Sequence, residues 1–516
     1  MLIRTYGSAV YGVNAVTITI EVNASEDAGI GYFLVGLPDN AVKESYQRME
    51  SALRYHDYQM PRKKMVINMA PADIRKEGSA YDLPLTMGFL AATGQVESAK
   101  VERYILMGEL ALDGTLKPIK GALPIAIQAR KENFEGFILP IENAQEAAIV
   151  NNIKVYGASS LKEVVEFFKG DENALTQVVI DTRKEFEANQ HKLLDDFSDV
   201  RGQENIKRAL EIAAAGGHNV ILIGPPGAGK TMLAKRLPGI LPPLNLQEAL
   251  ETTKIHSVAG KLARNSSLLY NRPYRSPHHT ISDVALVGGC NNPQPGEISL
   301  AHNGVLFLDE LPEFKRQVLE VMRQPLEERK ITISRARFSM EYPASFMLVA
   351  SMNPCPCGYF NHPEKECICG STVVQKYLSK VSGPLLDRID IHIEVTPVDF
   401  DQLTDARKSE KSEVIRERVV KAREVQSARY DALDGIFCNA QMSATMAREF
   451  CVLNQASNGL LKNAMNKLKL SARAYDRILK VARTISDLAG SPDIKTEHLA
   501  EAIQYRSLDR ESWGME

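Results

Sequence analysis

Hydrophobic runs of strand length alternate with helical stretches over the first part of the chain. The segments Ala15–Val22 and Lys64–Met69 are strand-like, whereas Asn40–Arg54 and Leu83–Thr93 have the character of helices. This mixture of strands and helices predicts an α/β domain over residues 1–165.

A second region repeats the alternation with shorter and more apolar strands. The strands expected at Asn219–Ile223, Gly304–Leu308 and Phe346–Ala350 are separated by helical segments. That order is typical of a parallel sheet whose crossover connections are helices. Each strand runs into polar residues or glycine, and ligands bind at this edge of such sheets. We therefore expect a second α/β domain, with a ligand site, over residues 201–400.

Two further regions differ from these domains in pattern. Asp171–Val200 contains eight acidic and three basic residues without sustained apolar periodicity, so we interpret residues 166–200 as a partly helical linker. The last part of the chain is helical in pattern and predicts a small lid over residues 401–516. Its clearest helices are expected at Glu413–Tyr430, Ala456–Leu468 and Arg473–Leu488.

Composition and charge limit the classes of protein that fit this pattern. With 516 residues, 44% of them hydrophobic, the chain has enough apolar side chain for a core in each of about three or four domains. The sequence lacks both an apolar run of about 18 residues and a signal peptide, so we expect a cytoplasmic protein without membrane contact. The net charge of −2 gives no overall attraction for nucleic acids, so any DNA contact must come from local basic clusters.

A glycine-rich turn separates the strand at Asn219–Ile223 from the helical segment that follows it. The turn consists of Gly224, Pro225, Pro226, Gly227, Ala228, Gly229, Lys230 and Thr231. This is the complete phosphate-loop pattern in the context that it requires, which favours it over a simple glycine turn. The glycines allow backbone N–H groups to face phosphates. Lys230 is expected to contact the β- and γ-phosphates of ATP, and the Thr231 hydroxyl to bind Mg²⁺.

The strand at Gly304–Leu308 ends in two carboxylates, Asp309 and Glu310. Asp309 is a candidate for holding the hydration shell of Mg²⁺, and Glu310 for polarising the attacking water as a general base. Acidic residues at strand ends often only meet solvent, but the phosphate loop favours the catalytic interpretation. The next strand ends in Asn353, whose amide would orient that water and contact the γ-phosphate. The alternative for Asn353 is an ordinary turn residue before Pro354.

The phosphate loop occurs together with four further motifs. They are Arg275–His279, Pro295–His302, Leu308–Leu311 and Asn353–Gly358. This set resembles the ComM/YifB group of magnesium-chelatase-like AAA+ ATPases, and the resemblance covers nearly the whole chain. It implies an N-terminal Lon-protease-like domain, a central AAA+ core, a helical lid of the magnesium-chelatase C-terminal type, and a homo-oligomeric ring that we expect to be a hexamer.

The resemblance also assigns two arginines. Arg388 would be an arginine finger that reaches the ATP of the neighbouring subunit and neutralises charge on the transferred phosphoryl group. A surface ion pair of Arg388 with Asp387 or Asp390 is the alternative. Arg473, at the start of a lid helix, is similar to a second sensor residue. Arg477 and Arg483 compete for that role.

Two segments are expected to reach the pore of such a ring. The family has a hairpin before the strand that ends in Asn353, and the alternating apolar and polar residues of Glu328–Tyr342 fit it. Its basic residues are Arg329, Lys330, Arg335 and Arg337. They would grip a phosphate backbone without reading its sequence, although a solvated edge hairpin would carry such charges too. The second segment is the insert at 271–280, where Arg272 and Arg275 are candidates for phosphate contacts and Tyr274 for stacking on a base.

Four of the seven cysteines lie within fifteen residues of one another. They form two Cys-x-Cys pairs, Cys355 with Cys357 and Cys367 with Cys369. Four thiolates are enough for a tetrahedral Zn²⁺ site, although the spacing differs from the common Cys-x2-Cys knuckle. Four reduced thiols in a loop are the alternative interpretation, and the sequence leaves the choice open.

The first domain resembles the Lon-protease-like domain of this family and of the recombination ATPase RadA. The likeness rests on Leu106–Gly121 and on Arg75–Ser79, which lies near the position of a Lon nucleophile. Where a Lon-type protease keeps its catalytic lysine, this chain has Leu123 and Pro124. Without a base for Ser79, a scaffold or DNA-guiding role is favoured over peptidase activity.

Three functions follow from these observations. The leading hypothesis is an ATP-driven translocase or helicase that acts on single-stranded or branched DNA, with branch migration of recombination intermediates as the implied activity. A magnesium-chelatase-type ATPase that remodels a protein partner is the second. An ATP-dependent protease is the third, and the missing lysine disfavours it.

Overall fold

The computed structural model describes most of the chain. The described residues are 2–25, 31–60, 63–189, 195–263, 266–289, 293–335, 338–360, 362, 364–397, 409–433, 435–468 and 470–506, without the side chains of Arg335 and Phe338. They fall into two compact units. The first unit comprises residues 1–189 and 245–270, and the second unit comprises residues 190–244 and 271–516.

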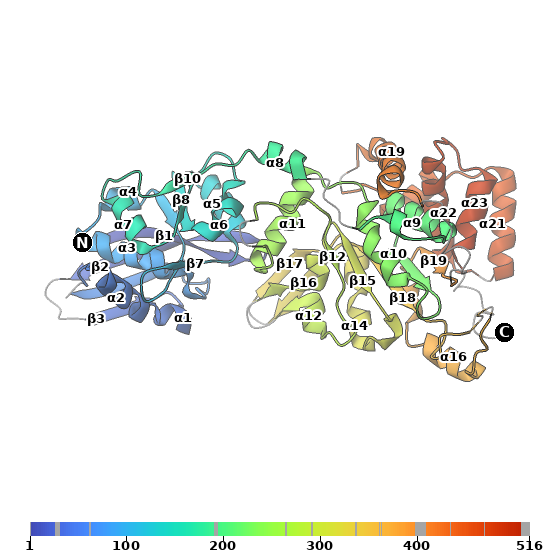
Figure 1. The fold of residues 1–516 in the computed structure, drawn as a ribbon, viewed down its shortest axis with the longest axis horizontal. Coiled ribbons are helices and arrows are strands. Elements are labelled where there is room, and N and C mark those ends of the chain that lie inside the picture. The colour runs from blue at the N-terminus through green and yellow to red at the C-terminus, as the bar shows by residue number, and fades with distance from the viewer. Residues whose placement is uncertain are drawn as a thin grey trace. The chain divides into compact units, whose positions relative to one another are not determined.

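The first unit is built on an eight-stranded mixed sheet (Figure 1). Its strands, in spatial order, are β10 (Thr176–Val178), β9 (Lys154–Ala158), β8 (Gly136–Pro140), β5 (Tyr104–Leu106), β1 (Leu2–Tyr11), β2 (Asn14–Ser25), β4 (Lys64–Ala70) and β3 (Gly31–Val35). The strands β2 and β4 confirm the two strands predicted from the sequence. Along β2 the residues Ile18, Ile20 and Val22 alternate with less buried neighbours, so this face of the sheet forms the core.

Helices and a short ribbon complete the first unit. The helices are α1 (Asn40–Lys43), α2 (Ser45–Tyr55), α3 (Asp82–Ala92), α4 (Ser98–Val101), α5 (Ala122–Lys131), α6 (Ile141–Ala148), α7 (Leu161–Phe168), α8 (Thr182–Asn189) and α11 (Leu246–Val258). The ribbon joins β6 (Glu109–Leu110) to β7 (Leu116–Lys117). Every residue of α3 is buried, which explains why this predicted helix is apolar on all sides.

The second unit contains a parallel five-stranded sheet. Its strands, in spatial order, are β12 (Tyr274–Arg275), β15 (Val305–Leu308), β18 (Met347–Met352), β11 (Val220–Ile223) and β19 (Ile391–Glu394). The pattern-based prediction of a parallel sheet is therefore confirmed. Because β18 lies between β15 and β11, the residues that follow these three strands meet at one edge.

Helices surround this sheet and continue into the lid (Figure 1). Those of the core are α9 (Glu204–Gly216), α10 (Lys230–Arg236), α12 (Asp283–Val287), α13 (Glu297–Leu300), α14 (Arg316–Val321), α15 (Arg323–Glu328), α16 (Ser371–Leu378) and α17 (Gly383–Leu386). Those of the lid are α19 (Ser412–Tyr430), α20 (Ala444–Phe450), α21 (Gln455–Leu468), α22 (Ala472–Leu488) and α23 (Thr496–Gln504). The helix α9 packs against both α19 and α22, so one hydrophobic core joins the sheet and the lid.

Two hairpins extend from the second unit. One joins β13 (Gly288–Gly289) to β14 (Gln294–Pro295), and the other joins β16 (Lys330–Arg335) to β17 (Phe338–Pro343). In the second hairpin Ile331 pairs with Tyr342 and Ile333 with Met340. All four side chains are buried, as the alternation in the sequence predicts.

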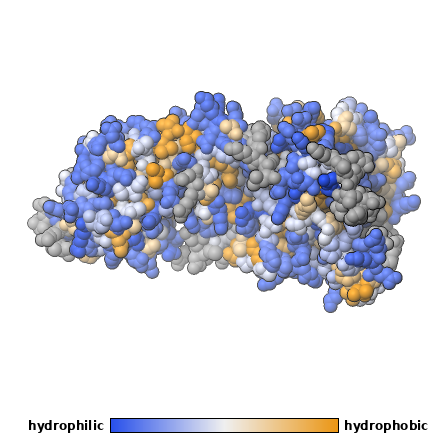
Figure 2. Space-filling model, viewed as in Figure 1, coloured by the Kyte–Doolittle hydropathy of each residue, from blue (hydrophilic) through white to orange (hydrophobic). Residues whose placement is uncertain are grey.

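The surface gives few further features. Most of the face seen in Figure 2 is hydrophilic, with scattered hydrophobic residues. Within the described part of the chain, every helix is too short or too polar to span a lipid bilayer. One segment groups differently from the sequence-based division, because residues 245–270 lie inside the expected ATPase core yet pack within the first unit.

Candidate functional site

The glycine-rich turn lies between β11 and α10, as a phosphate loop does. Gly227 and Gly229 have φ angles of +79° and +83°, which L side chains rarely adopt. At Gly224 a Cβ atom would lie 2.2 Å from the carbonyl oxygen of Val395, so a side chain is excluded there. The amide of Gln203 donates to the carbonyl of Ala228 at 2.9 Å and fixes the loop from the other side.

Lys230 is folded onto this loop. Its Nζ donates to the carbonyl oxygens of Gly224 at 2.7 Å and Pro225 at 2.9 Å. It also donates to Oδ1 of Asn353, at the end of β18, at 3.1 Å. Burial lowers the pKa of Lys230, and the carboxylates of Asp309 and Glu310 oppose that shift. The ammonium group is thus held where the ends of β11 and β18 meet.

Asp309 stands at the end of β15 and faces the first turn of α10. Its Oδ2 accepts a hydrogen bond from Thr231 Oγ1 at 2.9 Å, and its Oδ1 accepts one from the hydroxyl of Ser351. A hydroxyl and a carboxylate at this distance form an oxygen-rich pair that suits Mg²⁺. Sequence reasoning missed Ser351, whose signal is a hydroxyl in the otherwise apolar strand β18.

Glu310 follows directly in a left-handed backbone conformation with φ +54°. Its backbone N–H donates to Asp309 Oδ1 at 3.1 Å and to Ser351 Oγ at 3.3 Å. Its carboxylate lies 3.4 Å from Nδ1 of His279. Sequence reasoning gave His279 no role, and no sequence signal connects it with Glu310, because the two residues come from distant segments.

A pocket of about 570 Å³ opens beside Glu310. Its other lining residues are Glu313, Asn353, Pro356, Val373, Lys376, Tyr377 and Lys380. The pocket therefore joins the end of β15, the end of β18 and α16. Burial raises the pKa of Tyr377 to about 12, so this phenol keeps its proton at neutral pH.

The structure places Arg388 in the interior of its own chain. The side chain is 9% exposed and its guanidinium pairs with the carboxylate of Glu327. A separate pocket of about 490 Å³, formed mainly by α14, α15 and β16, includes Arg388. The alternative partners considered from the sequence, Asp387 and Asp390, are instead paired with Arg473 and Arg477 respectively.

The three candidate arginines of α22 differ in exposure. The side chain of Arg473 is 67% exposed, and it contacts Asp387 at 2.9 Å. Arg477 binds the buried Asp390, and Arg483 binds the buried Asp487 within its own helix. Arg477 thus joins the lid to the core and Arg483 lies in an ion pair within the lid, whereas Arg473 lies at the surface.

The insert at 271–280 is engaged with the fold. Arg272 donates to the carbonyl oxygens of Pro242 at 2.6 Å and Asn303 at 2.7 Å. Arg275 forms a two-pronged ion pair with Glu297, with distances of 2.6 and 2.7 Å. The ring of Tyr274 stacks on Phe307 of β15. These three side chains therefore hold the insert in place.

The basic residues of the hairpin have different contacts. Lys330 Nζ contacts Glu341 across the hairpin at 2.9 Å, and both side chains are about half exposed. Arg329 lies at the base of the hairpin, where its guanidinium approaches the carbonyl of Gly435 at 3.5 Å. The side chain of Arg335 and all of Arg337 lie outside the described residues.

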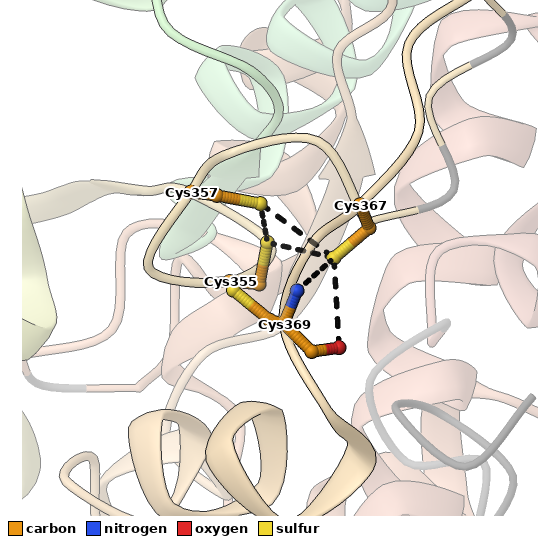
Figure 3. Close-up of side chains that lie close together, drawn as sticks. All are labelled: Cys355, Cys357, Cys367 and Cys369. Atoms are coloured by element: carbon orange, nitrogen blue, oxygen red, sulfur yellow. Dashed lines mark hydrogen bonds between the residues drawn. The ribbon is translucent and has the colours of Figure 1, made fainter.

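The four clustered cysteines converge at the end of β18 (Figure 3). The Sγ of Cys355 lies 3.2 Å from that of Cys357 and 3.6 Å from that of Cys367, and Cys357 lies 3.6 Å from Cys367. With Cys369 included, all four sulfur atoms lie within 4.8 Å of one another. All four are free thiols.

In the first unit Ser79 lacks the lysine of a Lon-type protease, but the expectation that it has no possible base is wrong, because a carboxylate lies beside it. The hydroxyl of Ser79 donates to the carboxylate of Glu109. Leu123, at the position expected for a lysine, is fully buried, and its backbone N–H donates to Glu146 at 2.8 Å. A buried leucine cannot accept the proton of Ser79.

Comparison with known proteins adds independent evidence. Family models described as "Subunit ChlI of Mg-chelatase", "Magnesium chelatase, subunit ChlI" and "Magnesium chelatase, subunit ChlI C-terminal" match residues 20–143, 196–403 and 409–506. Competence protein ComM of Haemophilus influenzae is 43% identical over 98% of this chain and 97% of its own length. The uncharacterized protein YifB of Escherichia coli is 43% identical over 97% and 96%. Lon protease 2 of Bacillus subtilis is 33% identical over 28% and 27%.

Proposed function

This chain belongs to the ComM/YifB family of magnesium-chelatase-like AAA+ ATPases, and from that premise we propose that it is an ATP-driven motor that acts on DNA. The proposed activity is translocation that moves the branch point of a recombination intermediate. The relative named a competence protein supports a DNA substrate. We place this motor in the cytoplasm. We also propose that it assembles into a homo-oligomeric ring, a hexamer.

The nucleotide site carries this proposal. The observation that supports it best is the meeting of Lys230 with Asn353 and of Thr231 with Asp309 at one edge of the sheet. In the proposed reaction, the N–H groups of the loop and Lys230 bind the phosphates of ATP, while Thr231 and Asp309 hold Mg²⁺. Bound Mg²⁺ supplies positive charge that offsets the charge on the phosphate oxygens.

Hydrolysis then depends on side chains beside the pocket. Glu310 takes the proton of the attacking water as general base, and Asn353 orients that water toward the γ-phosphate. Asn353 already accepts a hydrogen bond from Lys230, so a γ-phosphate that draws the lysine away would free the amide to contact it. Glu310 and Asn353 line the same pocket.

A neighbouring subunit would complete the site. We propose Arg388 as the arginine finger, which requires its guanidinium to exchange Glu327 for a phosphate when subunits assemble. Arg473 is proposed as the second sensor, because its exposure leaves it available while Arg477 and Arg483 are paired with buried carboxylates. The arginine-finger proposal predicts that isolated subunits hydrolyse ATP poorly.

DNA binding is proposed for the hairpin of β16 and β17. The buried Ile331 and Tyr342 pair with each other and anchor the two strands of the hairpin. Lys330, Arg335 and Arg337 would contact phosphates without reading the bases. Arg272 and Arg275 would contact DNA only if it displaced the groups that they now bind.

ATPase assays with single-stranded, duplex, forked and four-way DNA test the proposal. We expect DNA to stimulate hydrolysis, and Lys230→Ala to reduce it by at least about 100-fold, because the phosphates lose their main cation. Joint substitution Arg335→Ala and Arg337→Ala is expected to leave basal hydrolysis and to remove the stimulation. Lys131→Ala with Lys162→Ala, exposed in the first unit, is the control. Normal stimulation of the hairpin variant would refute the hairpin assignment.

A second candidate function is a chelatase motor that remodels a protein partner during magnesium insertion. The three family models, all named for a subunit of magnesium chelatase, favour it. The near full-length match to ComM, which includes the first unit, favours the DNA motor. Copurification with a large chelatase subunit, together with no effect of DNA on hydrolysis, would reverse this order.

We further propose that the four-cysteine cluster binds Zn²⁺. Zinc–sulfur bonds of about 2.3 Å in a tetrahedron place sulfur atoms about 3.8 Å apart, whereas a disulfide requires about 2.05 Å. The observed separations of 3.2 to 3.6 Å are close to the first value. The backbone N–H of Cys369 donates to Sγ of Cys367 at 3.4 Å, a contact that suits a metal-bound thiolate.

A further inference from the structure

The four-cysteine segment connects three parts of the nucleotide site. It starts two residues after Asn353, passes the phosphate loop, and ends at Gly370, the N-cap of α16. We infer that zinc binding by this segment braces Asn353, the phosphate loop and α16, so that zinc loading controls nucleotide affinity. The inference rests on the zinc and nucleotide sites proposed above and adds a function for the metal.

The first contact is with the phosphate loop. Gly358 has a φ angle of +85°, and a Cβ atom there would lie 2.6 Å from Cδ of Pro226. Its backbone therefore lies directly on the loop, too close for any side chain. The N–H of Gly358 also donates to the carbonyl of Cys355 at 3.0 Å, which makes this contact part of the turn that Cys355 and Cys357 form.

The second contact is with Asn353. Cys355 is fully buried and follows Asn353 and Pro354 directly, so its position limits where the amide of Asn353 can lie. That amide accepts the hydrogen bond from Lys230. A change in the position of Cys355 would therefore reach the lysine that binds phosphates.

The third contact is with α16. Cys369 is adjacent to the first residues of this helix, and the hydroxyl of Tyr377 in the helix interacts with the backbone of Asn353. Pro356, which lies between two of the cysteines, lines the pocket together with Tyr377 and Glu310. The cysteine cluster thus lies between Asn353 and α16, which both contribute to the lining of this pocket.

A metal is suited to this role because the residue between the second pair of cysteines adds no apolar packing. Ile368, between Cys367 and Cys369, is 88% exposed, so it adds no hydrophobic core to the cluster. Bonds from one ion to four thiolates would close the segment between Cys355 and Cys369 and remove most of its conformational freedom. Loss of the ion would leave Gly358 and Asn353 free to shift from the phosphate loop.

The test compares Cys369→Ser with the wild-type protein, and Cys451→Ala, which removes a free thiol elsewhere in the second unit, is the control. Zinc is measured by elemental analysis, and affinity is measured with a fluorescent ATP analogue and Mg²⁺. We expect about one zinc ion per chain in the wild type and the control. We expect Cys369→Ser to lose zinc and to bind the analogue about tenfold more weakly.

The outcomes separate the proposals. Loss of zinc with unchanged affinity overturns the brace and leaves the zinc site standing. Absence of zinc from the wild type overturns both, and a wild type that contains zinc but fails to bind the analogue overturns the nucleotide site. Wild type stripped by a chelator should recover its affinity when zinc is returned; affinity that stays high throughout the stripping also contradicts the brace. This arm remains decisive if Cys369→Ser fails to fold.

Discussion

At the scale of single residues, Glu310 shows how the site is held ready. A left-handed conformation is costly for a residue with a side chain, and the surroundings must compensate. Asp309 and Ser351 accept the backbone N–H, and His279 lies beside the carboxylate. His279 belongs to the insert that we expected at the pore. A residue of this insert thus contacts the proposed general base.

We predict that His279→Ala increases ATP hydrolysis in the absence of DNA, by about two- to tenfold. The imidazole lies 3.4 Å from the carboxylate and limits its movement, so its removal leaves Glu310 freer to reach the attacking water. Stimulation by DNA should decrease correspondingly. Steady-state ATPase assays with and without DNA measure both effects.

His278→Ala is the matched control, since this ring stacks on His279 but bonds to Thr280. His279→Asn, which keeps a polar side chain beside Glu310, should behave more like the wild type. If His279→Ala reduces hydrolysis in both conditions, the imidazole instead positions Glu310 for catalysis.

Those residues of this site that belong to a recognisable local sequence motif were predicted from the sequence. The phosphate loop has a fixed pattern, and Asp309 with Glu310 forms an acidic pair that a buried strand would not otherwise carry. His279 and Glu327 had no such signal, because their partners lie far away in the chain. Their contacts exist only after the sheet has brought the strand ends together.

At the scale of elements, the buried Asp390 joins the lid to the core. It lies just before β19 and accepts hydrogen bonds from Arg477 of α22 at 2.7 Å and from the backbone N–H of Asn219 at 3.1 Å. His218 contacts it at 3.3 Å. Burial by itself would raise the pKa of Asp390, but the charge of Arg477 and the contact with His218 hold it well below its usual range.

We predict that Asp390→Asn lowers the free energy of unfolding by about 3–5 kcal/mol at neutral pH, because Arg477 would lose its buried counter-charge. A depressed pKa means that the carboxylate stabilises the fold above its unfolded pKa of about 4. That contribution is lost as the pH falls from this value toward the folded-state pKa. The difference in the free energy of unfolding between wild type and variant should therefore be largest at pH 7 and decrease below pH 4.

Denaturant unfolding at several pH values provides the measurement. Asp387→Asn is the control, because it removes the more exposed pair with Arg473 and should cost at most about 1 kcal/mol. A difference that stays constant down to pH 2 would show that the charge of Asp390 is not responsible.

The secondary-structure elements also fall into two groups: those specified by their own sequence pattern and those that depend on contacts with distant segments. Long periodic segments such as α19 and α22, and apolar strands such as β11 and β18, were predicted from their pattern. The strand β12 has only two residues and forms because Tyr274 pairs with Val305 of β15. No pattern of that length specifies a strand, so it could not be predicted.

At the scale of the whole molecule, α11 is the least expected feature. Its sequence position lies in the ATPase region, yet it packs on α5 of the first unit. The carboxylate of Glu146, buried in α6, accepts hydrogen bonds from the Ser257 hydroxyl and from the backbone N–H of Leu123. The backbone N–H of Gly121 donates to the carbonyl of Ser257 at 3.2 Å.

We predict that Ser257→Ala destabilises the first unit by about 1–3 kcal/mol, because the buried Glu146 loses a donor. Hydrogen exchange followed by mass spectrometry should show faster exchange in α5, α6 and α11 together. Gln247→Ala, on the exposed side of α11, should leave these rates unchanged. Faster exchange in α11 alone would mean that its packing on the first unit is weak.

The route of the chain has a practical result for anyone who engineers this protein. The polypeptide enters the second unit after residue 189, returns to the first at 245, and leaves it again after 270. A chimera that transplants residues 1–189 as one cassette would therefore leave α11 behind, and α5 would lose its cover. A graft that preserves the first unit has to carry 245–270 along with it.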